Sequence, residues 1–432
     1  MELAPKRKEY TEQIMLLAFE MQDSGEMQVF QDDYLYWDKV KYKSSKNSDL
    51  LDVWSAIKFQ RFIKSKFLKF GKYTFSYPTT DFIQRTLHEF DLNTGGTLTS
   101  NIGIAETDKS KFMISSLIEE SINSSQMEGA STTRKKAKEM IQQEKKPQNK
   151  SEIMIMNNYV TMKHIVQIKE QDLSVEKLLE IHKLISKGTL DDINEEGCFR
   201  TNDEIFVANV FKGEVVHQPP AVDELPTLIH DLIKFFNEDS NDFIHPIIKG
   251  CVIHFMIGWI HPFTDGNGRT ARALFYWYML KNGYWLTEYL SISKIIKDSK
   301  NQYEKAYLFT ENDDNDLGYF ITYHLKAMIK AYEALKTHIH SKQKEVVQAA
   351  KFLKIEGVND RMAQIIKIIY DDSDRILTSK EVENKFNISN FTARTDLKTL
   401  VKLGFLEEVQ VNLKKKNYIK SKTFDSKIKH LK

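Results

Sequence analysis

The sequence predicts a mainly α-helical protein with more than one domain. The chain has 432 residues, a length typical of two or three domains. Apolar residues recur at helical spacing through most of residues 104–345. Within that segment, Phe199–Pro220 alternates instead, which predicts a β-hairpin. We therefore expect an N-terminal helical region over 1–103, a helical core over 104–345 and a small domain over 351–432.

The N-terminal region is expected to hold helices at Glu12–Met21 and Leu50–Phe67. The second stretch has apolar residues at helical spacing and lacks glycine and proline. The aromatic run Tyr34-Leu-Tyr-Trp-Asp38 is interpreted as packing, the usual role of such a set. Asp91–Gly103 contains adjacent glycines and predicts a loop at a domain boundary.

The core segment is expected to be a series of helices joined by short breaks. The hairpin among them alternates at Ile205, Val207, Val215 and His217 around a Lys212-Gly213 turn. The first helix ends at Gly129, a residue suited to a C-terminal cap. The predicted helices are Ile114–Met127, Arg134–Glu144, Glu152–Glu170, Val175–Ser186, Val222–Phe236, Pro246–Ile260, Thr270–Lys281, Ser293–Leu308 and Leu317–Thr337.

The C-terminal segment is basic, with 18 Lys and Arg against 11 Asp and Glu from Lys351 onward in a chain of net charge +2. Three short helices are predicted, at 361–370, 379–386 and 390–403, before a basic hairpin at Lys414–Lys416. This order is that of a winged helix, a variant of helix-turn-helix. Its third helix would present Thr392, Arg394 and Lys398 to DNA; a solvated lysine-rich tail is the alternative interpretation.

Several classes of protein are excluded by composition. Only two cysteines occur, Cys198 and Cys251, so neither a disulfide framework nor a cysteine metal cluster is expected. Both cysteines, like His182 and His254, are predicted to be packed in the core. The charged start lacks the apolar segment of a signal peptide, and no apolar run approaches the roughly 20 residues of a membrane helix. A cytoplasmic protein with no membrane partner is expected.

One stretch, His261-Pro-Phe-Thr-Asp-Gly-Asn-Gly-Arg-Thr-Ala-Arg272, concentrates the chemistry of the chain. It is a polar loop that leads directly into a helix, whose first N–H groups lack internal partners and attract anions. Gly266 and Gly268 allow the backbone to approach a ligand closely. Arg269 and Arg272 are three apart and share a helix face, which favours a polyphosphate ligand.

Three interpretations of this loop compete. A dinucleotide fingerprint matches Gly266-x-Gly268-x-x-Ala271 but requires a preceding strand, whereas the flanks are helical. A tight turn with solvent-facing charges leaves the joint spacing unexplained. Chemistry on a nucleoside triphosphate explains it: His261 would accept a proton, Asp265 would bind Mg²⁺, and the amides around Asn267 and Gly268 would stabilise phosphate charge with Arg269.

At every fixed position the loop resembles the signature of the Fic family, H-P-F-x-[D/E]-G-N-G-R-x-x-R. The resemblance extends over about residues 30–340 and includes Leu178–Leu184, Gly197–Arg200 and the hairpin before Pro219-Pro220. It implies a helical fold and transfer of AMP from ATP to a Ser, Thr or Tyr hydroxyl of a target protein. The hairpin, over 204–218, would be the family's flap, which docks an extended target segment by strand addition.

The resemblance also assigns roles within the loop. His261 would be the general base and Asp265 the Mg²⁺ ligand. Gly266, Asn267 and Gly268 would form an anion hole for the α- and β-phosphates. Arg269 and Arg272 would hold the β- and γ-phosphates, and Tyr303 would lie near the base.

A second motif, Ser124-Ser-Gln-Met-Glu128-Gly129, resembles the Fic inhibitory motif [S/T]-x-x-x-E-[G/N]. Ser124 and Glu128 are four residues apart and share a helix face. The Glu128 carboxylate would engage the Arg272 guanidinium and misalign ATP. The sequence thus predicts an auto-inhibited protein adenylyltransferase that uses ATP and Mg²⁺ on a protein target.

Other functions are left open at this point. A Fic enzyme could instead remove AMP, or transfer UMP or another phosphate-linked group. A protein of another class, a DNA-binding transcriptional regulator with the Fic core as a sensor, would use residues 351–432 as its main activity. The sequence does not identify the target, the modified side chain or the signal that relieves inhibition, and it leaves a homodimer open.

Overall fold

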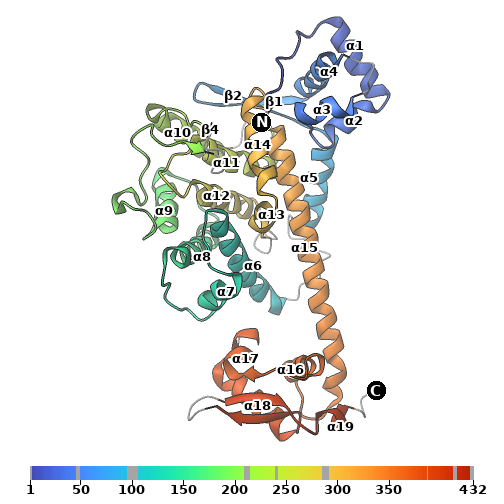
Figure 1. Cartoon of the computed structure of the whole chain (residues 1–432), viewed down its shortest axis with the longest axis vertical. Coiled ribbons are helices and arrows are strands. Elements are labelled where there is room, and N and C mark those ends of the chain that lie inside the picture. Colours follow the sequence, from blue (N-terminus) through green and yellow to red (C-terminus); the bar gives the residue numbers. More distant parts are fainter. Residues whose placement is uncertain are drawn as a thin grey trace. The chain divides into compact units, whose positions relative to one another are not determined.

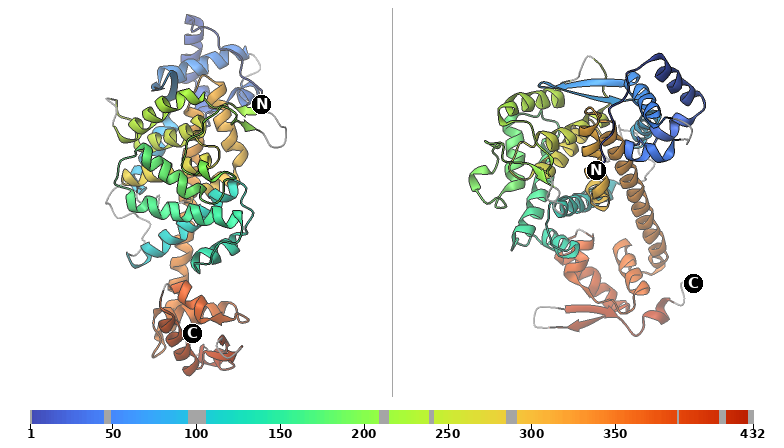
Figure 2. Two further views of the ribbon diagram at one scale, coloured as in Figure 1. Left: turned by 90° about the vertical axis from the view of Figure 1, so that its left-hand side faces the viewer. Right: turned by 45° about the horizontal axis from the view of Figure 1, so that its top comes forward.

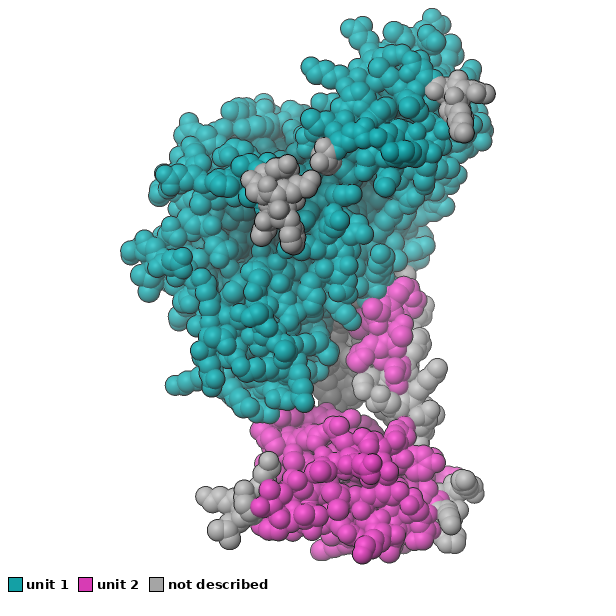
Figure 3. All heavy atoms as spheres, in the orientation of Figure 1, with its two compact units in different colours: residues 1–332 teal, residues 333–432 magenta. Residues whose placement is uncertain are grey.

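Helices dominate the computed structural model, as the sequence predicts (Figure 1). The chain divides into a unit of residues 1–332 and a unit of residues 333–432 (Figure 3). The three-part division expected from the sequence remains a prediction. The structure describes residues 2–44, 49–94, 106–208, 215–238, 242–284, 291–386, 388–411 and 416–428.

The N-terminal region begins with four helices, α1 (Glu12–Asp23), α2 (Glu26–Gln31), α3 (Trp37–Lys43) and α4 (Leu50–Ile63). The predicted helix Leu50–Phe67 is wrong beyond Ile63, because a hairpin of β1 (Ser65–Phe70) and β2 (Tyr73–Pro78) follows. This hairpin turns at Gly71, where φ is 54°. Tyr34 and Tyr36 are buried, which confirms that the aromatic run packs.

The expected boundary loop Asp91–Gly103 is wrong at its start, because helix α5 (Asp81–Thr94) covers residues 91–94. Its remaining residues, 95–103, lie outside the described residues. Thus the first hundred residues contain more regular structure than apolar periodicity alone predicts.

The remaining helices of the first unit largely follow the prediction. The predicted helix Ser293–Leu308 is divided at Ser299, where φ is −125°. The predicted helix Leu317–Thr337 continues to Ala350. The helices are α6 (Glu106–Met127), α7 (Arg134–Gln142), α8 (Lys150–Ile168), α9 (Val175–Ser186), α10 (Leu225–Asn237), α11 (Pro246–Ile260), α12 (Asn267–Lys281), α13 (Ile292–Asp298), α14 (Lys300–Asn312) and α15 (Gly318–Ala350), of which residues 333–350 belong to the second unit.

Two helices form the centre of the first unit. In α11 every residue except Pro246 and Gly258 is buried, and in α12 every residue except Gly268 and Lys281. A helix that is apolar on all sides must be enclosed by others. Accordingly α11 and α12 pack on each other, α10 covers α11, and α6, α8 and α9 cover α12 (Figure 2). The loop between α11 and α12 is therefore held at both ends by the best-packed part of the unit.

The predicted flap hairpin is present in the described residues. Strand β3 (Val207–Ala208) pairs antiparallel with β4 (Val215–His217), with Val207 opposite His217. The residues between them, 209–214, lie outside the described residues. The described strands contain two and three residues, so side-chain contacts near them are needed to fix their position.

The second unit contains α16 (Asp360–Asp371), α17 (Ser379–Phe386), α18 (Asn390–Lys402) and α19 (Phe424–Ile428). Its strands β5 (Leu377–Thr378), β6 (Leu406–Gln410) and β7 (Lys416–Lys420) form a sheet in the order β5-β7-β6. The three predicted helices are thus present, whereas β5 and α19 were not predicted, and the winged-helix assignment stays a prediction. Lys414 and Lys415 of the basic hairpin lie outside the described residues. Across the described part of the chain, no helix is long and apolar enough to span a membrane.

Candidate active site

His261 ends α11 in a left-handed conformation, with φ 50° and ψ 56°. Its N–H donates to the Ile257 carbonyl at 3.0 Å. The ring Nδ1 lies 3.0 Å from the Gly258 carbonyl oxygen, which can only accept, so Nδ1 carries the proton. The Nε2 lone pair is therefore left to accept a proton from another group.

The surroundings of His261 keep its imidazole neutral. Burial is the largest cause that lowers its pKa below the usual value, and the neighbouring His217 and Arg200 act in the same direction. The Gly258 carbonyl and the Glu128 carboxylate oppose this shift without cancelling it. A neutral imidazole near neutral pH is the form that a general base requires.

Two side chains hold the loop after His261. The Asn267 amide bridges Phe263, accepting from its N–H at 3.0 Å and donating to its carbonyl at 2.8 Å. His182 accepts from Gly197 N–H at Nδ1, so its Nε2–H donates to the Asp265 carbonyl at 2.9 Å. The Asn267 side chain is thus engaged in hydrogen bonds that stabilise the loop. Its backbone N–H, at the start of α12, is the group of Asn267 that can bind an anion.

His182 illustrates what the sequence did not reveal. Its ring stacks on Phe263 with centroids 3.7 Å apart, and burial lowers its pKa to about 4. The predicted packing of His182 and His254 is confirmed, since both are fully buried. The contact of His182 with the loop, 83 residues away, had no local signal. Of the two cysteines predicted in the core, Cys251 is buried but Cys198 is exposed.

An anion already lies at the start of α12. Gly266 adopts φ 86° before the helix, and the first backbone N–H groups of α12 lack intrahelical acceptors. A Cβ built on Gly268 would lie only 2.2 Å from Glu128 Oε1. The Glu128 carboxylate therefore sits directly over the Gly268 backbone, where the helix end attracts negative charge.

Arg272 holds this carboxylate in place, as the inhibitory motif predicts. Its Nη2 donates to Glu128 Oε1 at 2.8 Å and to the Ser124 carbonyl at 3.1 Å, and its Nε donates to Ser124 Oγ at 2.8 Å. Removal from water would raise the pKa of Glu128, but Arg272, together with Arg269 and Lys300, lowers the pKa below its usual value. The pair is thus ionised and joins α6 to α12.

Backbone geometry at the end of α6 aims Glu128. The Ala130 N–H donates to the Ser125 carbonyl and the Gly129 N–H donates to the Gln126 carbonyl, the two bonds of a Schellman cap. Gly129 supplies the left-handed residue of this cap, with φ 95°. Glu128 is the last residue before that turn, so the cap fixes its direction.

The two loop arginines are placed differently. Arg269 is fully buried, and its Nη1 donates to the Ile185 carbonyl at 3.1 Å while Nη2 lies 3.4 Å from Asp265 Oδ2. Its Nε has no hydrogen-bond acceptor among the described residues. Arg269 therefore lies beneath the loop with one unmatched donor, whereas Arg272 faces α6.

Asp265 and Tyr303 complete the predicted set. The Asp265 side chain is 54 % exposed, and its Oδ1 accepts from the Gly266 N–H at 2.5 Å. The Tyr303 hydroxyl lies 2.9 Å from His254 Nε2, and burial raises the pKa of Tyr303 while Arg272 lowers it. Tyr303 is thus beside His254 and Arg272, and its described hydrogen bonds do not reach His261.

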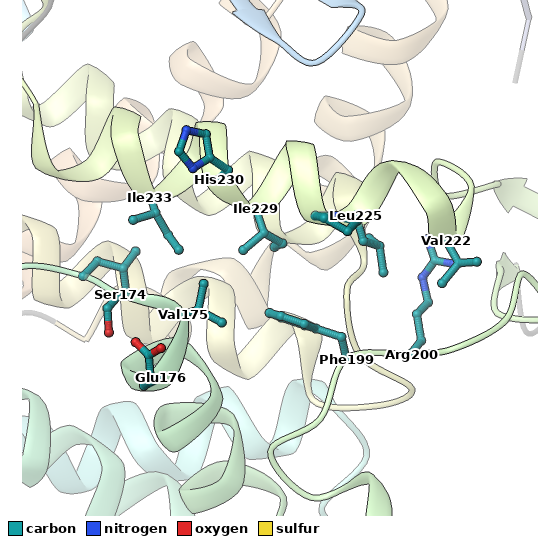
Figure 4. A pocket seen from close by; sticks show the side chains of 12 residues that line it. Ser174, Val175, Glu176, Phe199, Arg200, Val222, Leu225, Ile229, His230 and Ile233 are labelled. Atoms are coloured by element: carbon teal, nitrogen blue, oxygen red, sulfur yellow. The ribbon is translucent and has the colours of Figure 1, made fainter.

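A separate apolar pocket of about 670 Å³ lies between the start of α9 and one face of α10 (Figure 4). Phe199 and Arg200 form one wall, and the Phe199 ring stacks on Phe263 of the loop at 5.5 Å. Leu225 and Ile229 line the opposite wall on α10. None of the residues predicted from the sequence to act in catalysis lines it.

Comparison with known proteins agrees with the resemblance seen in the sequence. Residues 172–279 match the model of the Fic/DOC family. The proteins named "Protein adenylyltransferase Fic" from Drosophila sechellia and Drosophila melanogaster are each 31 % identical over 117 residues, covering 27 % of this chain. The matched region spans only 22 % of the length of these curated relatives.

A solved structure extends the likeness of fold. Residues 134–508 of Fic-1 from C. elegans superpose with a TM-score of 0.51 and 17 % identity, over 79 % of this chain and 90 % of that one. At this identity the likeness concerns the fold alone. It covers more of the chain than the family model does, and thus takes in helices outside residues 172–279.

Proposed function

We propose that this chain, which carries a Fic domain at residues 172–279, is an auto-inhibited protein adenylyltransferase. It would transfer AMP from ATP to a Ser, Thr or Tyr hydroxyl of a target protein or of itself. One observation carries the proposal: a carboxylate lies over Gly268 at the start of α12, held by Arg272. A site that holds an anion in this way at rest is suited to a phosphate in its active state.

The proposed step needs a base and an anion hole. His261 Nε2 accepts the proton of the target hydroxyl, and the freed oxygen attacks the α-phosphorus of ATP. A new oxygen–phosphorus bond forms as the bond from the α-phosphorus to the bridging oxygen breaks, and pyrophosphate leaves. The N–H groups of Asn267 and Gly268 would stabilise the charge on the phosphate oxygens, as preorganised donors do.

The arginines would hold the departing phosphates. Arg272 offers a planar guanidinium once Glu128 withdraws, and Arg269 offers its unmatched Nε. In the inhibited state, here called the braked state, Glu128 is bound to Arg272. ATP would then be held without the contact between Arg272 and its γ-phosphate. The α-phosphorus is then out of line for attack.

The residues present fit Mg²⁺ held by the substrate. This ion commonly binds through one carboxylate and the phosphates of a nucleotide. Asp265 offers such a carboxylate, since its side chain is 54 % exposed at the edge of the loop. When bound, Mg²⁺ would neutralise phosphate charge. No cluster of three acidic, histidine or cysteine side chains suited to an independent metal site occurs within the described ranges.

Substitution of Glu128 tests the proposal. Glu128→Gly removes the carboxylate over Gly268 and frees Arg272, so incorporation of label from α-labelled ATP into protein should rise by about tenfold or more over wild type. Loss of a charge-assisted hydrogen bond releases about 1.5–3 kcal/mol, which corresponds to an increase in rate of about ten- to hundredfold. Mass spectrometry of the products should show a mass increase of one AMP.

Two companion variants make the result interpretable. Glu128→Gln keeps the shape of the side chain but not its charge and should fall between wild type and Glu128→Gly. The double variant Glu128→Gly with His261→Ala should lose incorporation, because the base is gone. Activity of Glu128→Gly no higher than wild type would refute the brake, and a fully active His261→Ala would refute the base.

A second candidate function, DNA binding, is favoured by the surface of α18. Arg394, Lys398 and Lys402 are exposed on this helix, whereas its single acid, Asp396, is buried and paired with Arg361 at 2.8 Å. Ser389 caps the helix by accepting from the Thr392 N–H. We propose that α18 contacts the phosphates and bases of a DNA duplex, as recognition helices do.

A further inference from the structure

The C-terminal carbonyls of α11 are capped by side chains from the base of the flap. The last carbonyls of a helix lack intrahelical partners, and the helix dipole favours cations there. His261 takes the Gly258 carbonyl through its own Nδ1, as described above. The next carbonyl, of Trp259, lies 2.8 Å from Nε2 of His217, which belongs to flap strand β4.

His217 is joined to a third element by its other ring nitrogen. Nδ1 lies 2.7 Å from Oε2 of Glu311 on α14. The Trp259 carbonyl can only accept, so Nε2 carries a proton, and a second proton lies between Nδ1 and Glu311. The His217 side chain is 8 % exposed and that of Glu311 19 % exposed, so water competes weakly for these bonds.

Arg200 makes the matching connection on the other side of the flap. Its Nε donates to the His261 carbonyl at 3.0 Å and its backbone N–H to the Pro262 carbonyl at 2.9 Å. Its guanidinium also donates to Asp203 Oδ1 at 3.0 Å, before the flap, and to the Pro220 carbonyl, after it. Both ends of the flap are thus tied to the residues around the base.

We infer that His217, paired with Glu311, is a positioning residue that fixes the flap relative to His261. The inference rests on the proposed function, in which an extended target segment pairs with the flap and presents a hydroxyl to Nε2 of His261. A hydroxyl on a strand reaches the base only if strand and base keep a fixed spacing. His217 supplies that spacing, because it joins β4 to a carbonyl two residues before His261.

The chain offers a set of variants that separates this role from general stability. His217→Ala removes both bonds. Glu311→Ala leaves only the bond to Trp259. Glu311→Gln keeps both, because the amide can donate to Nδ1 while Nε2–H still donates to Trp259. His230→Ala, at an exposed histidine on α10, is the matched control for loss of an imidazole.

Amide hydrogen exchange tests the inference without any catalytic activity. In the full chain, the backbone amides of β3 and β4 should exchange about tenfold faster in His217→Ala than in wild type, and by less in Glu311→Ala. Glu311→Gln and His230→Ala should match wild type. Unchanged exchange in β3 and β4 of His217→Ala would overturn the inference, and so would an equal increase throughout α11 and α12, which would indicate a structural role only.

Kinetics in the Glu128→Gly background supply the second readout. His217→Ala should lower the rate of self-modification at saturating ATP about tenfold, since misplacement of a reacting group is costly, while the KM for ATP stays within about twofold. Glu311→Gln should restore the rate. A rate unchanged by His217→Ala would overturn the inference. If Glu128→Gly itself transfers no AMP but the amides of β3 and β4 exchange faster in His217→Ala as expected, the proposed function fails, while the role of His217 in fixing the flap stands.

Discussion

At the scale of single residues, the site depends on which atoms are already engaged. The Nδ1–H of His261 donates to the Gly258 carbonyl, so the ring has one defined tautomer in which Nε2 is the acceptor. The Arg272 guanidinium donates to Ser124 and Glu128. It is therefore free to bind a phosphate only when the end of α6 moves away from it. In the proposed function, catalysis and inhibition therefore compete for Arg272, while His261 keeps the same tautomer in both states.

The ionisation of His261 yields a prediction at this scale. Burial and the nearby cations lower its pKa, so its imidazole should take up a proton only below the usual pKa of about 6.5. The base is then neutral at pH 7, and its competence is lost as the pH falls through the lowered pKa. Titration of ¹³C-labelled histidine by NMR should show this midpoint, with the His261 signal assigned by its absence from His261→Ala.

His230 provides the internal reference for this titration, because it is an exposed histidine of the same unit. Its signal should persist in His261→Ala. A His261 midpoint at or above 6.5 would show that burial does not control the base.

At the scale of elements, the proposed inhibitory residue, Glu128, lies at the last turn of a helix. Glu128 is neither on a mobile arm nor in the helix interior; it precedes a Schellman cap that sets its direction. Deeper in α6, the buried Glu120 accepts from the Ser293 N–H at 3.0 Å and from Tyr276 Oη at 2.8 Å. Release of Glu128 therefore requires only the end of α6 to change, while the rest of the helix stays bound to α12 and α13.

Gly129→Ala tests this control by the helix end. A Cβ there meets no atom within 4 Å, so the cost is that of the left-handed backbone at φ 95°, about 1 kcal/mol. The free energy of unfolding should fall by this amount in chemical denaturation. Transfer of AMP should rise above wild type and remain below Glu128→Gly, because Glu128 loses its fixed direction.

Gly25→Ala is the control for backbone strain, since Gly25 has φ 79° and is equally open. It should cost similar stability in the same unit and leave the transfer rate unchanged. Equal rates for Gly129→Ala and wild type would show that the cap does not aim Glu128.

At the scale of the whole molecule, two units are proposed to carry two different functions. The first holds the loop, the brake and the flap, and the second holds a helix with exposed cations, α18. The second unit has its own core around Phe352, Ile366, Leu397 and Tyr418. Its function can therefore be tested by substitutions that leave the first unit intact.

DNA binding by α18 should depend on salt in proportion to the phosphates it contacts. In a fluorescence titration of a labelled duplex, Arg394→Ala and Lys398→Ala should each reduce the slope of log affinity against log salt by about 1. Lys367→Ala, which removes the same charge from α16, should leave the slope unchanged. Wild-type slopes in all three variants would assign the surface of α18 to another partner.

Features of the fold and the site could be predicted from the sequence where their signals lie within a short stretch of the chain. The helices of the core, the hairpin and the loop were predicted because their signals are local: periodicity, alternation and a dense motif. The Glu128–Arg272 contact was also predicted, although 144 residues separate the partners, because both belong to recognisable motifs. The β1–β2 hairpin was missed because α4 runs into it without a break residue.

The contacts that fix the site were beyond local reasoning. His182 was predicted to pack, yet nothing in its helix indicated that it holds the Asp265 carbonyl. Glu311 lies in an unremarkable polar stretch of α14, and only the fold brings it to His217. The inhibitory motif singled out Arg272 as the partner of Glu128, but nothing in the sequence indicated that Arg269 would donate to the Ile185 carbonyl or that Arg272 would donate to the Ser124 carbonyl.

The position of Glu128 over Gly268 has a quantitative consequence. An inhibitor built into the chain is present at one fixed effective concentration, which dilution does not change. The transfer rate at saturating ATP in wild type should therefore equal that of Glu128→Gly multiplied by the fraction of molecules whose site is open, so a ratio of about ten would correspond to about one open molecule in ten. The resting population is thus a property of a single chain, and the concentration of the protein does not shift it.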